Sequence, residues 1–218
     1  MNFKKYTITI LSVLLLISCS KDDDNGNKNQ GFVTTWQTTA SNEDITIYTN
    51  SSYTYNYTVD WGDGTISNNA IGTVSHTYAT AGAHTVSITG DFPAIYNYES
   101  PNNAAKLQTI ESWGNIAWKS MYYAFSGCVN LRLNTKDAPN LSSVTSLRGV
   151  FRGASSFNQD LSGWDVSNVI DMNDMFRNSS SFNQDLSDWA TGNVRNCYDF
   201  SIGSALTISN LPTLGRCF

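Results

Sequence analysis

The same eight residues occur twice in this chain, 25 positions apart. The octapeptide SSFNQDLS occupies 155–162 and recurs unchanged at 180–187. The repetition extends beyond it, because three sets of mostly apolar residues recur at a spacing of 26 and then 25 residues: Met121, Leu147, Met172 and Cys197; Phe125, Phe151 and Phe176; and Trp118, Val144, Val169 and Val194. A fixed period of roughly 20–50 residues predicts stacked units that bury their apolar side chains against their neighbours.

Each unit combines a short alternating stretch with large apolar side chains. The stretch Val169-Ile170-Asp171-Met172 predicts a strand in a parallel stack, and Phe182 and Trp189 are expected in the core behind it. Because one unit alone cannot offset its loss of conformational entropy, the copies must fold together. We therefore expect a solenoid over 107–200, closed by a C-terminal cap over 201–218.

The polar part of the repeat, Asn158-Gln159-Asp160 and its copy at 183–185, allows two interpretations. It could present hydrogen-bonding groups at a regular spacing to an extended ligand. Alternatively, these side chains could satisfy backbone groups at tight corners and form a ladder between neighbouring units. The regularity favours the structural interpretation. For the same reason we expect Trp164 and Trp189 in the core rather than as stacking platforms for sugars.

Candidate catalytic groups are few. Asp160 and Asp185 form the kind of acidic pair that a glycosidase needs, but they occupy equivalent positions in two copies, so the motif supplies no distinct acid. Neither His76 nor His84 lies in the repeat region beside the cysteines, so no base for a cysteine nucleophile is indicated. The sequence therefore predicts no catalytic residues and no enzymatic activity.

A longer motif joins these features, reading WDVSNV at 164–169, DM at 171–172, MF at 175–176 and SFNQDLS-x-W at 181–189. It resembles the BspA-like leucine-rich-repeat surface proteins, also known as Mycoplasma-type lipoprotein repeats, from Leu107 to the C-terminus. The resemblance implies a leucine-rich-repeat-like solenoid of about 25-residue units. It also implies cell-surface adhesion or binding of host or matrix proteins, without family-wide catalytic residues.

The segment 32–92 has a different pattern, with short alternating strands at 45–48, 53–59 and 85–88. Asp60-Trp61-Gly62-Asp63-Gly64-Thr65 contains a strong tight-turn signal, and His76-Thr77-Tyr78 follows it. The combination resembles a PKD-type domain, which implies a small immunoglobulin-like β-sandwich that acts as a spacer or binding module. Residues 93–106, with Pro93 and Pro101, are expected to form a linker.

This segment also contains residues that could bind a metal ion. His76 and His84 are eight residues apart, which is neither a helical-face nor a zinc-finger spacing, and Asp63 is the nearest further ligand. The two histidines could face each other across a hairpin. Asp60 and Asp63 lack the alternating oxygen ligands and closing glutamate of an EF-hand. We therefore expect structural histidines, a turn, and no metal or other cofactor.

The N-terminus predicts the location of the protein. A basic start and a short apolar core end in Leu16-Ile17-Ser18-Cys19, which resembles the lipobox of bacterial lipoproteins. The resemblance implies a signal peptide over 1–18 and lipid on Cys19, and a secretory signal without lipidation is the alternative. Residues 19–31 are expected to be a flexible tether whose Lys and Asp residues favour the outer face of the bacterial outer membrane over the periplasm.

The net charge restricts the possible partners, and the cysteines predict a disulfide. Removal of the leader takes two of the 13 basic residues, leaving 11 against 18 acidic ones and a formal charge of −7, so nucleic acid is an improbable partner. Three cysteines remain beside Cys19. We expect a disulfide between Cys197 and Cys217, which bracket the tail, and an unpaired, buried Cys128.

Together these features predict a cell-surface lipoprotein that attaches to the membrane through Cys19 and binds a host or matrix protein without catalysis. The alternative is a carbohydrate-binding accessory lipoprotein of a glycan-uptake system. The sequence does not assign binding residues to either function.

Overall fold

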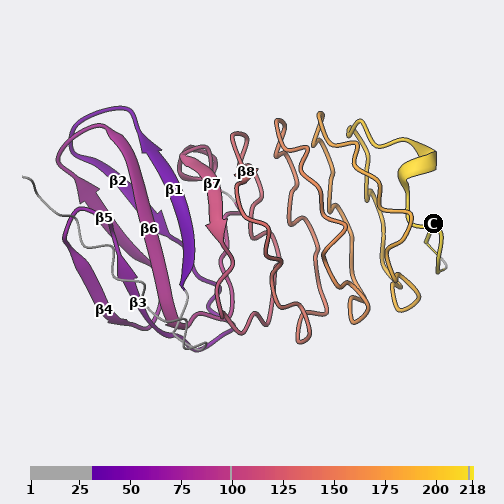
Figure 1. Cartoon of the computed structure of the whole chain (residues 1–218), viewed down its shortest axis with the longest axis horizontal. Coiled ribbons are helices and arrows are strands. Elements are labelled where there is room, and N and C mark those ends of the chain that lie inside the picture. The colour runs from indigo at the N-terminus through magenta and orange to yellow at the C-terminus, as the bar shows by residue number, and fades with distance from the viewer. Residues whose placement is uncertain (1–30, 99, 216) are drawn as a thin grey trace, which may run out of the picture.

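A computed structural model describes residues 31–98, 100–215 and 217–218. The chain is mainly β, with two sheets at one end and a stack of coils that extends from them to the C-terminus (Figure 1). The expected signal peptide 1–18, the lipidated Cys19 and all but the last residue of the tether 19–31 lie outside the described residues.

The larger sheet has six strands in the order β4-β3-β6-β1-β7-β8. A separate pair, β2 and β5, forms the second sheet. Apart from the parallel pair β7–β8, neighbouring strands are antiparallel. The strands are β1 (Phe32–Thr38), β2 (Glu43–Ile47), β3 (Asn56–Asp60), β4 (Ile66–Ala70), β5 (Val74–Tyr78), β6 (Gly82–Asp91), β7 (Leu107–Ser112) and β8 (Arg132–Leu133).

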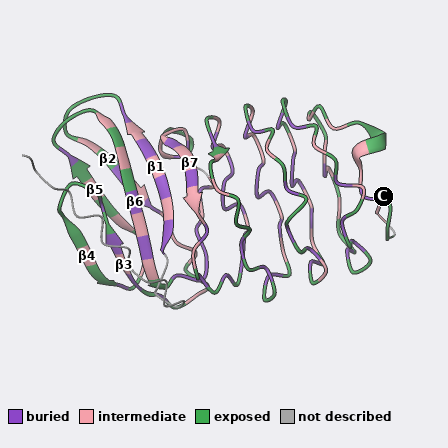
Figure 2. Cartoon of the chain, in the orientation of Figure 1, coloured by how far each residue is buried: buried purple, intermediate pink, exposed green. Residues whose placement is uncertain are grey.

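Alternation along the strands places apolar side chains between the two sheets. Every second residue of β1, from Phe32 to Thr38, is buried, and Ile45 and Ile47 of β2 are fully buried in the same core. Figure 2 shows this alternation of buried and more accessible residues on β1 and β6. The strands expected from the sequence overlap β2, β3 and β6.

The expected turn between β3 and β4 is confirmed. Asp60 Oδ1 accepts a hydrogen bond from Gly62 N at 2.9 Å, and Asp63 Oδ1 accepts one from Thr65 N at 3.0 Å. Gly62 has a φ of +79°, and a Cβ there would lie 2.2 Å from the carbonyl oxygen of Thr85. Glycine is therefore required both by the backbone conformation and by the close approach of β6.

Residues 93–106, expected as a linker, pack tightly between the sheets and the coils. Ala94 and Ile95 are buried, and the short helix α1 (Pro101–Ala104) buries Ala104. The chain then enters β7, which pairs with β1 on one side and with β8 on the other. The larger sheet thus continues from the first part of the molecule into the first coil, and both parts share one core.

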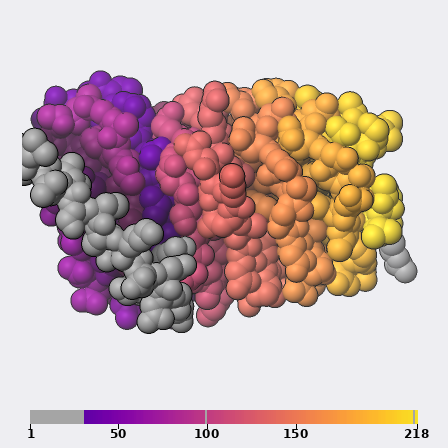
Figure 3. Space-filling view, in the orientation of Figure 1, coloured from indigo at the N-terminus to yellow at the C-terminus, as the bar shows by residue number. Residues whose placement is uncertain are grey.

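The coils lie side by side along the long axis of the molecule (Figure 3). Isolated parallel bridges link Ser146 to Asp171 and Asp171 to Asn196 on successive coils. The strand expected at 169–172 is therefore reduced to bridges at single residues. The cause is local, because Asp174 has a φ of +57° and the chain turns there instead of continuing in the extended conformation.

One set of residues in the left-handed conformation recurs with the same spacing as the apolar positions. They are Tyr123, Gly149, Asp174 and Asp199, with φ between +49° and +60°. Only Gly149 can adopt this conformation without cost, whereas aspartate tolerates it and a tyrosine there is unusual. The turn at this position of each coil therefore depends on packing between the coils and not on one residue type.

Phenylalanine rings form two columns through the coils. The ring of Phe151 lies 6.0 Å from that of Phe125 and 5.8 Å from that of Phe176, with interplanar angles of 19° and 11°. Phe157 and Phe182 are stacked in the same way at 5.9 Å. All five side chains are fully buried, which confirms the expected burial of the repeated aromatic residues.

The tail lies over the last coil. It contains a short 3-10 helix, η1 (Ile208–Asn210), and the ring of Phe218 packs against that of Phe200 at 4.9 Å. Cys197 and Cys217 form the expected disulfide, which joins the last coil to the end of the chain. Cys128 is the free cysteine of the described chain and is buried, also as expected.

Replacing Cys197 and Cys217 together with serine is expected to lower the free energy of unfolding by about 3 kcal/mol, because the disulfide closes a loop of 20 residues. Urea unfolding of the oxidised protein and the double variant measures the difference. The unaltered protein in reductant should match the double variant. Equal stability of the oxidised protein and the double variant would show that the tail holds without its cross-link.

Candidate functional site

The polar motif of the repeat forms a ladder of hydrogen bonds along the surface of the coils. Asn158 Oδ1 accepts from Asn183 N at 2.9 Å and from Gln184 Nε2 at 2.8 Å. One coil later, Asn183 Oδ1 accepts from Thr207 N and Asn210 Nδ2, both at 3.0 Å. The favoured structural interpretation of this motif is therefore confirmed for the third coil onward.

The two acidic residues of the motif have equivalent roles. Asp160 Oδ1 accepts from Ser162 N at 2.8 Å, and Asp185 Oδ1 accepts from Ser187 N at 2.9 Å. These backbone N–H groups lower the pKa of both carboxyl groups. Both side chains are held in the charged form, whereas a glycosidase needs one of its pair protonated.

The two repeated tryptophans lie in the core. Trp164 is 5% exposed and Trp189 is 3% exposed, so neither offers a ring face on which a sugar could stack. The indole Nε1 of Trp189 donates to the carbonyl oxygen of Leu161 on the preceding coil at 3.1 Å.

The two histidines, which the sequence allowed to face each other across a hairpin, lie in different sheets. His76 in β5 pairs with Ile45 of the smaller sheet, whereas His84 in β6 pairs with Trp36 of the larger sheet. Both rings instead contact Tyr78, at centroid distances of 4.6 Å and 3.6 Å.

Each histidine has a hydrogen-bonding partner. His76 Nε2 lies 2.7 Å from Asp63 Oδ2, and His84 Nε2 lies 2.8 Å from the hydroxyl of Thr38. The hydroxyl of Thr65, together with His76, lowers the pKa of Asp63 to about 2. Within the described ranges, no three His, Cys, Asp or Glu side chains come together in a group that could hold a metal ion.

A strip of larger side chains occupies one equivalent position on four successive coils. Tyr122, Arg148, Asn173 and Tyr198 follow the same spacing as the core residues, and we refer to them as the tyrosine–arginine strip. The side chain of Arg148 is 40% exposed and Tyr198 is 76% exposed. The ring of Tyr96 stacks on Tyr122 at 6.2 Å and extends the aromatic surface toward the sheets.

Arg148 of the strip and the neighbouring Arg177 form ion pairs with aspartates. The carboxylate of Asp174 lies 3.7 Å from the guanidinium of Arg148 and 3.2 Å from that of Arg177, which also contacts Asp199 at 2.5 Å. The strip therefore presents aromatic rings and an ion-paired arginine. The two arginines and two aspartates of these ion pairs have no net charge together.

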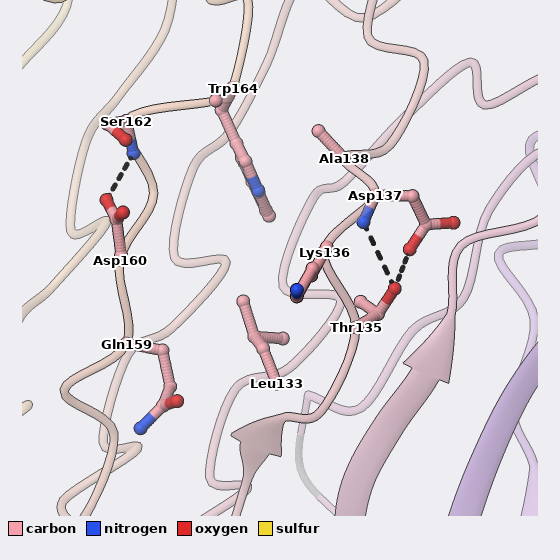
Figure 4. Close-up of a pocket in the computed structure, with 10 residues that line it drawn as sticks. Leu133, Thr135, Lys136, Asp137, Ala138, Gln159, Asp160, Ser162 and Trp164 are labelled. Carbon is pink, nitrogen blue, oxygen red and sulfur yellow. Dashed lines mark hydrogen bonds between the residues drawn. The ribbon is translucent and has the colours of Figure 1, made fainter.

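A cavity of about 360 Å³ lies between the first and second coils (Figure 4). One side is formed by the chain that follows β8, including Leu133 and Lys136. The other side carries Gln159, Asp160 and Trp164 of the first complete polar motif. In Figure 4 the side chains of Lys136 and Trp164 point into the space between the two segments.

Residues 98–207 match the model of a protein family described as "Mycoplasma protein of unknown function, DUF285". The match extends over about half of the chain and includes α1 and all the coils. The chain belongs to this family. The expected similarity to Mycoplasma-type repeats is thereby confirmed, while the strands β1 to β6 precede the part that DUF285 describes. No curated protein and no solved structure matches the chain.

Cys19 lies outside the described residues, in which no helix is long and apolar enough to cross a bilayer. Neither the tyrosine–arginine strip nor the cavity of this DUF285 member was expected from the sequence. The strip was detectable in principle, since its residues share the spacing of the core positions, although their chemical types differ.

Proposed function

We propose that the protein is a non-catalytic binding or adhesion module of the bacterial cell surface, with a host or matrix protein as its ligand. The observation that carries this proposal is the tyrosine–arginine strip, in which exposed Tyr198 and half-exposed Arg148 lie on the surface of the coils. Tyrosine and arginine are enriched at protein interfaces, because each supplies a large contact area together with hydrogen-bonding groups.

We also propose that each part of the fold belongs to a known structural class. The two packed sheets and the Asp60–Thr65 turn support a PKD-type, immunoglobulin-like sandwich as the first domain. The 25-residue period, the Asn158–Asn183 ladder and the parallel bridges support a leucine-rich-repeat-like solenoid. In this proposal the first domain is a spacer and the solenoid presents the binding surface.

We also propose that lipid on Cys19 attaches the protein to the outer membrane. The solenoid would then be exposed on the cell surface. The support for this attachment is the lipobox-like sequence and the acidic tether that follows it. The acidic charge of the mature chain supports a partner other than nucleic acid.

Tyr198→Ser is expected to weaken binding to a matrix protein about tenfold or more, because exposed aromatic residues often dominate the affinity of an interface. Binding to a panel of immobilised matrix proteins, measured by surface plasmon resonance, provides the readout. Ile208→Ser is the matched control, since Ile208 is 90% exposed but lies in the tail. The proposal fails if the panel retains nothing, or if Tyr198→Ser binds as tightly as the unaltered protein.

A carbohydrate-binding accessory protein of a glycan-uptake system is the second candidate. The cavity between the first and second coils favours it, because sugar sites combine apolar walls with a few convergent polar groups.

A further inference from the structure

The hydrogen-bonded ladder is interrupted at its first step, beside the cavity. Asn158 serves the third coil as an acceptor, but its counterpart in the first coil, 26 positions earlier, is Arg132, whose side chain has no hydrogen-bond acceptor. Gln184 donates to Asn158 Oδ1 at 2.8 Å, whereas the amide of its counterpart Gln159 has no hydrogen-bonding partner among the described residues. An unpaired amide therefore lines the cavity.

An indole N–H beside the cavity is also without a protein partner within the ranges that the structure describes. Trp189 donates to Leu161 on the coil before it, but the corresponding Nε1 of Trp164 donates to nothing in the described part of the chain. Trp164 is only 5% exposed, so this donor is a polar group of a buried side chain. Figure 4 shows its ring directed into the cavity. The N–H is therefore available to a hydroxyl group in the cavity.

Two further groups complete the polar lining. Lys136 extends its ammonium group into the cavity and forms no ion pair with any described residue. Asp160 uses one oxygen to accept from Ser162 N, and a carboxylate has more acceptor sites than that bond occupies. Asp137, in contrast, is engaged by the hydroxyl of Thr135 and by Trp113 N.

The charges of the lining select against an ionic ligand. An anion attracted by Lys136 would also approach the carboxylates of Asp137 and Asp160, and a cation attracted by the carboxylates would approach the ammonium group. A neutral molecule with many hydroxyl groups avoids both penalties. Each hydroxyl both donates and accepts, so it can pair with the donors and with Asp160 in turn.

We propose that this cavity binds a neutral sugar ring at the end or within a short segment of a glycan. Its volume of about 360 Å³ lies at the small end of the range for ligand sites, roughly 300–1,000 Å³. Leu133 and Ala138 supply an apolar wall for the ring carbons, and Lys136, Gln159, Asp160 and the Trp164 N–H bind hydroxyl groups. The inference rests on the carbohydrate-binding candidate and is independent of the tyrosine–arginine strip.

Isothermal titration of the full chain in detergent with neutral gluco-, manno- and xylo-oligosaccharides tests the proposal. We expect binding by at least one series, and about a 3- to 10-fold loss of affinity in Gln159→Ala, the range that one hydrogen bond supplies. Gln184→Ala is the matched control, because this amide belongs to the ladder and not to the cavity. It should bind sugar as the unaltered protein does.

Arg132→Asn provides a converse test, since it places at the first step the residue type that pairs with the glutamine one coil later. We expect this variant to lose sugar binding while remaining folded. In NMR spectra of the unaltered protein, the indole N–H resonance of Trp164 should move when sugar is added, and that of Trp189 should stay.

Three results would overturn the inference: no heat with any neutral series, tighter binding of acidic sugars than of neutral ones, or unchanged affinity in Gln159→Ala. Matrix-protein binding that depends on Tyr198 would survive such a result, so the failure of the sugar site is distinguishable from the failure of the adhesion function.

Discussion

Replacing Phe176 with alanine is expected to lower the free energy of unfolding by about 3–5 kcal/mol. The side chain is fully buried, and its ring contacts those of Phe182 at 3.9 Å, Phe200 at 5.4 Å and Phe151 at 5.8 Å. The loss in stability is the sum of the transfer free energy of the ring and the cost of the cavity left inside the stack. Since domains unfold at about 5–15 kcal/mol, this one change removes a large share of the stability.

Urea unfolding followed by tryptophan fluorescence measures the effect of Phe176→Ala. Ile208→Ala is the control and should change the free energy of unfolding by less than about 0.5 kcal/mol, because Ile208 is 90% exposed. Because coils are stable only against their neighbours, we also expect the last coils to lose hydrogen-exchange protection before the sheets do. A loss below about 1 kcal/mol in Phe176→Ala would contradict a stack held by its aromatic columns.

Gly149→Ala is the second change with a large expected effect, about 2–4 kcal/mol. Part of the loss is the cost of a left-handed conformation for a residue with a Cβ, since Gly149 has a φ of +60°. The rest is overpacking, because the new Cβ would lie 2.3 Å from the ring of Tyr123, which is itself buried. Thermal and urea unfolding measure the total.

A double-mutant cycle separates the two causes. In a Tyr123→Ala background the clash disappears, so Gly149→Ala should cost less there than in the unaltered protein. Gly192→Ala is the matched control, because no atom lies within 4 Å of the added Cβ and the backbone there is not left-handed. Equal costs of Gly149→Ala in both backgrounds would assign the whole effect to the backbone.

The repeat could be predicted from the sequence because it depends on the spacing of large apolar residues. Phe151 and Phe176 occupy equivalent places in the core for the same reason that they occur 25 positions apart. The turn at Asp63-Gly64 was predictable from local backbone chemistry, and the pairing of Cys197 with Cys217 from their position around the tail.

Other features depend on contacts that local patterns do not encode. The pairing of β7 with β1 joins residues more than 70 positions apart, so the close packing of residues 93–106 between them could not be expected from the prolines and asparagines of that segment. The placement of His76 and His84 in different sheets also follows from strand order, which alternation alone does not determine.

The candidate sites were harder to predict than the fold. The ladder is interrupted beside the cavity at Arg132, a residue that is unremarkable in its own segment and matters only because asparagine occupies the equivalent place in later coils. Its detection requires the alignment of the first, divergent coil against the others in three dimensions. The unused N–H of Trp164 likewise becomes visible only beside the engaged N–H of Trp189.

Asn158 accepts a hydrogen bond from Asn183, and Asn183 accepts one from the tail. This repetition has a consequence for the evolution of the protein. A duplicated 25-residue segment inserted between these steps would find the same acceptor below it and offer the same acceptor above it. Neither the sheet at one end nor the cross-linked tail at the other would need to change. The distance between Tyr122 and Tyr198 could therefore grow in equal increments, so that gene duplication alone would adjust the reach of the molecule.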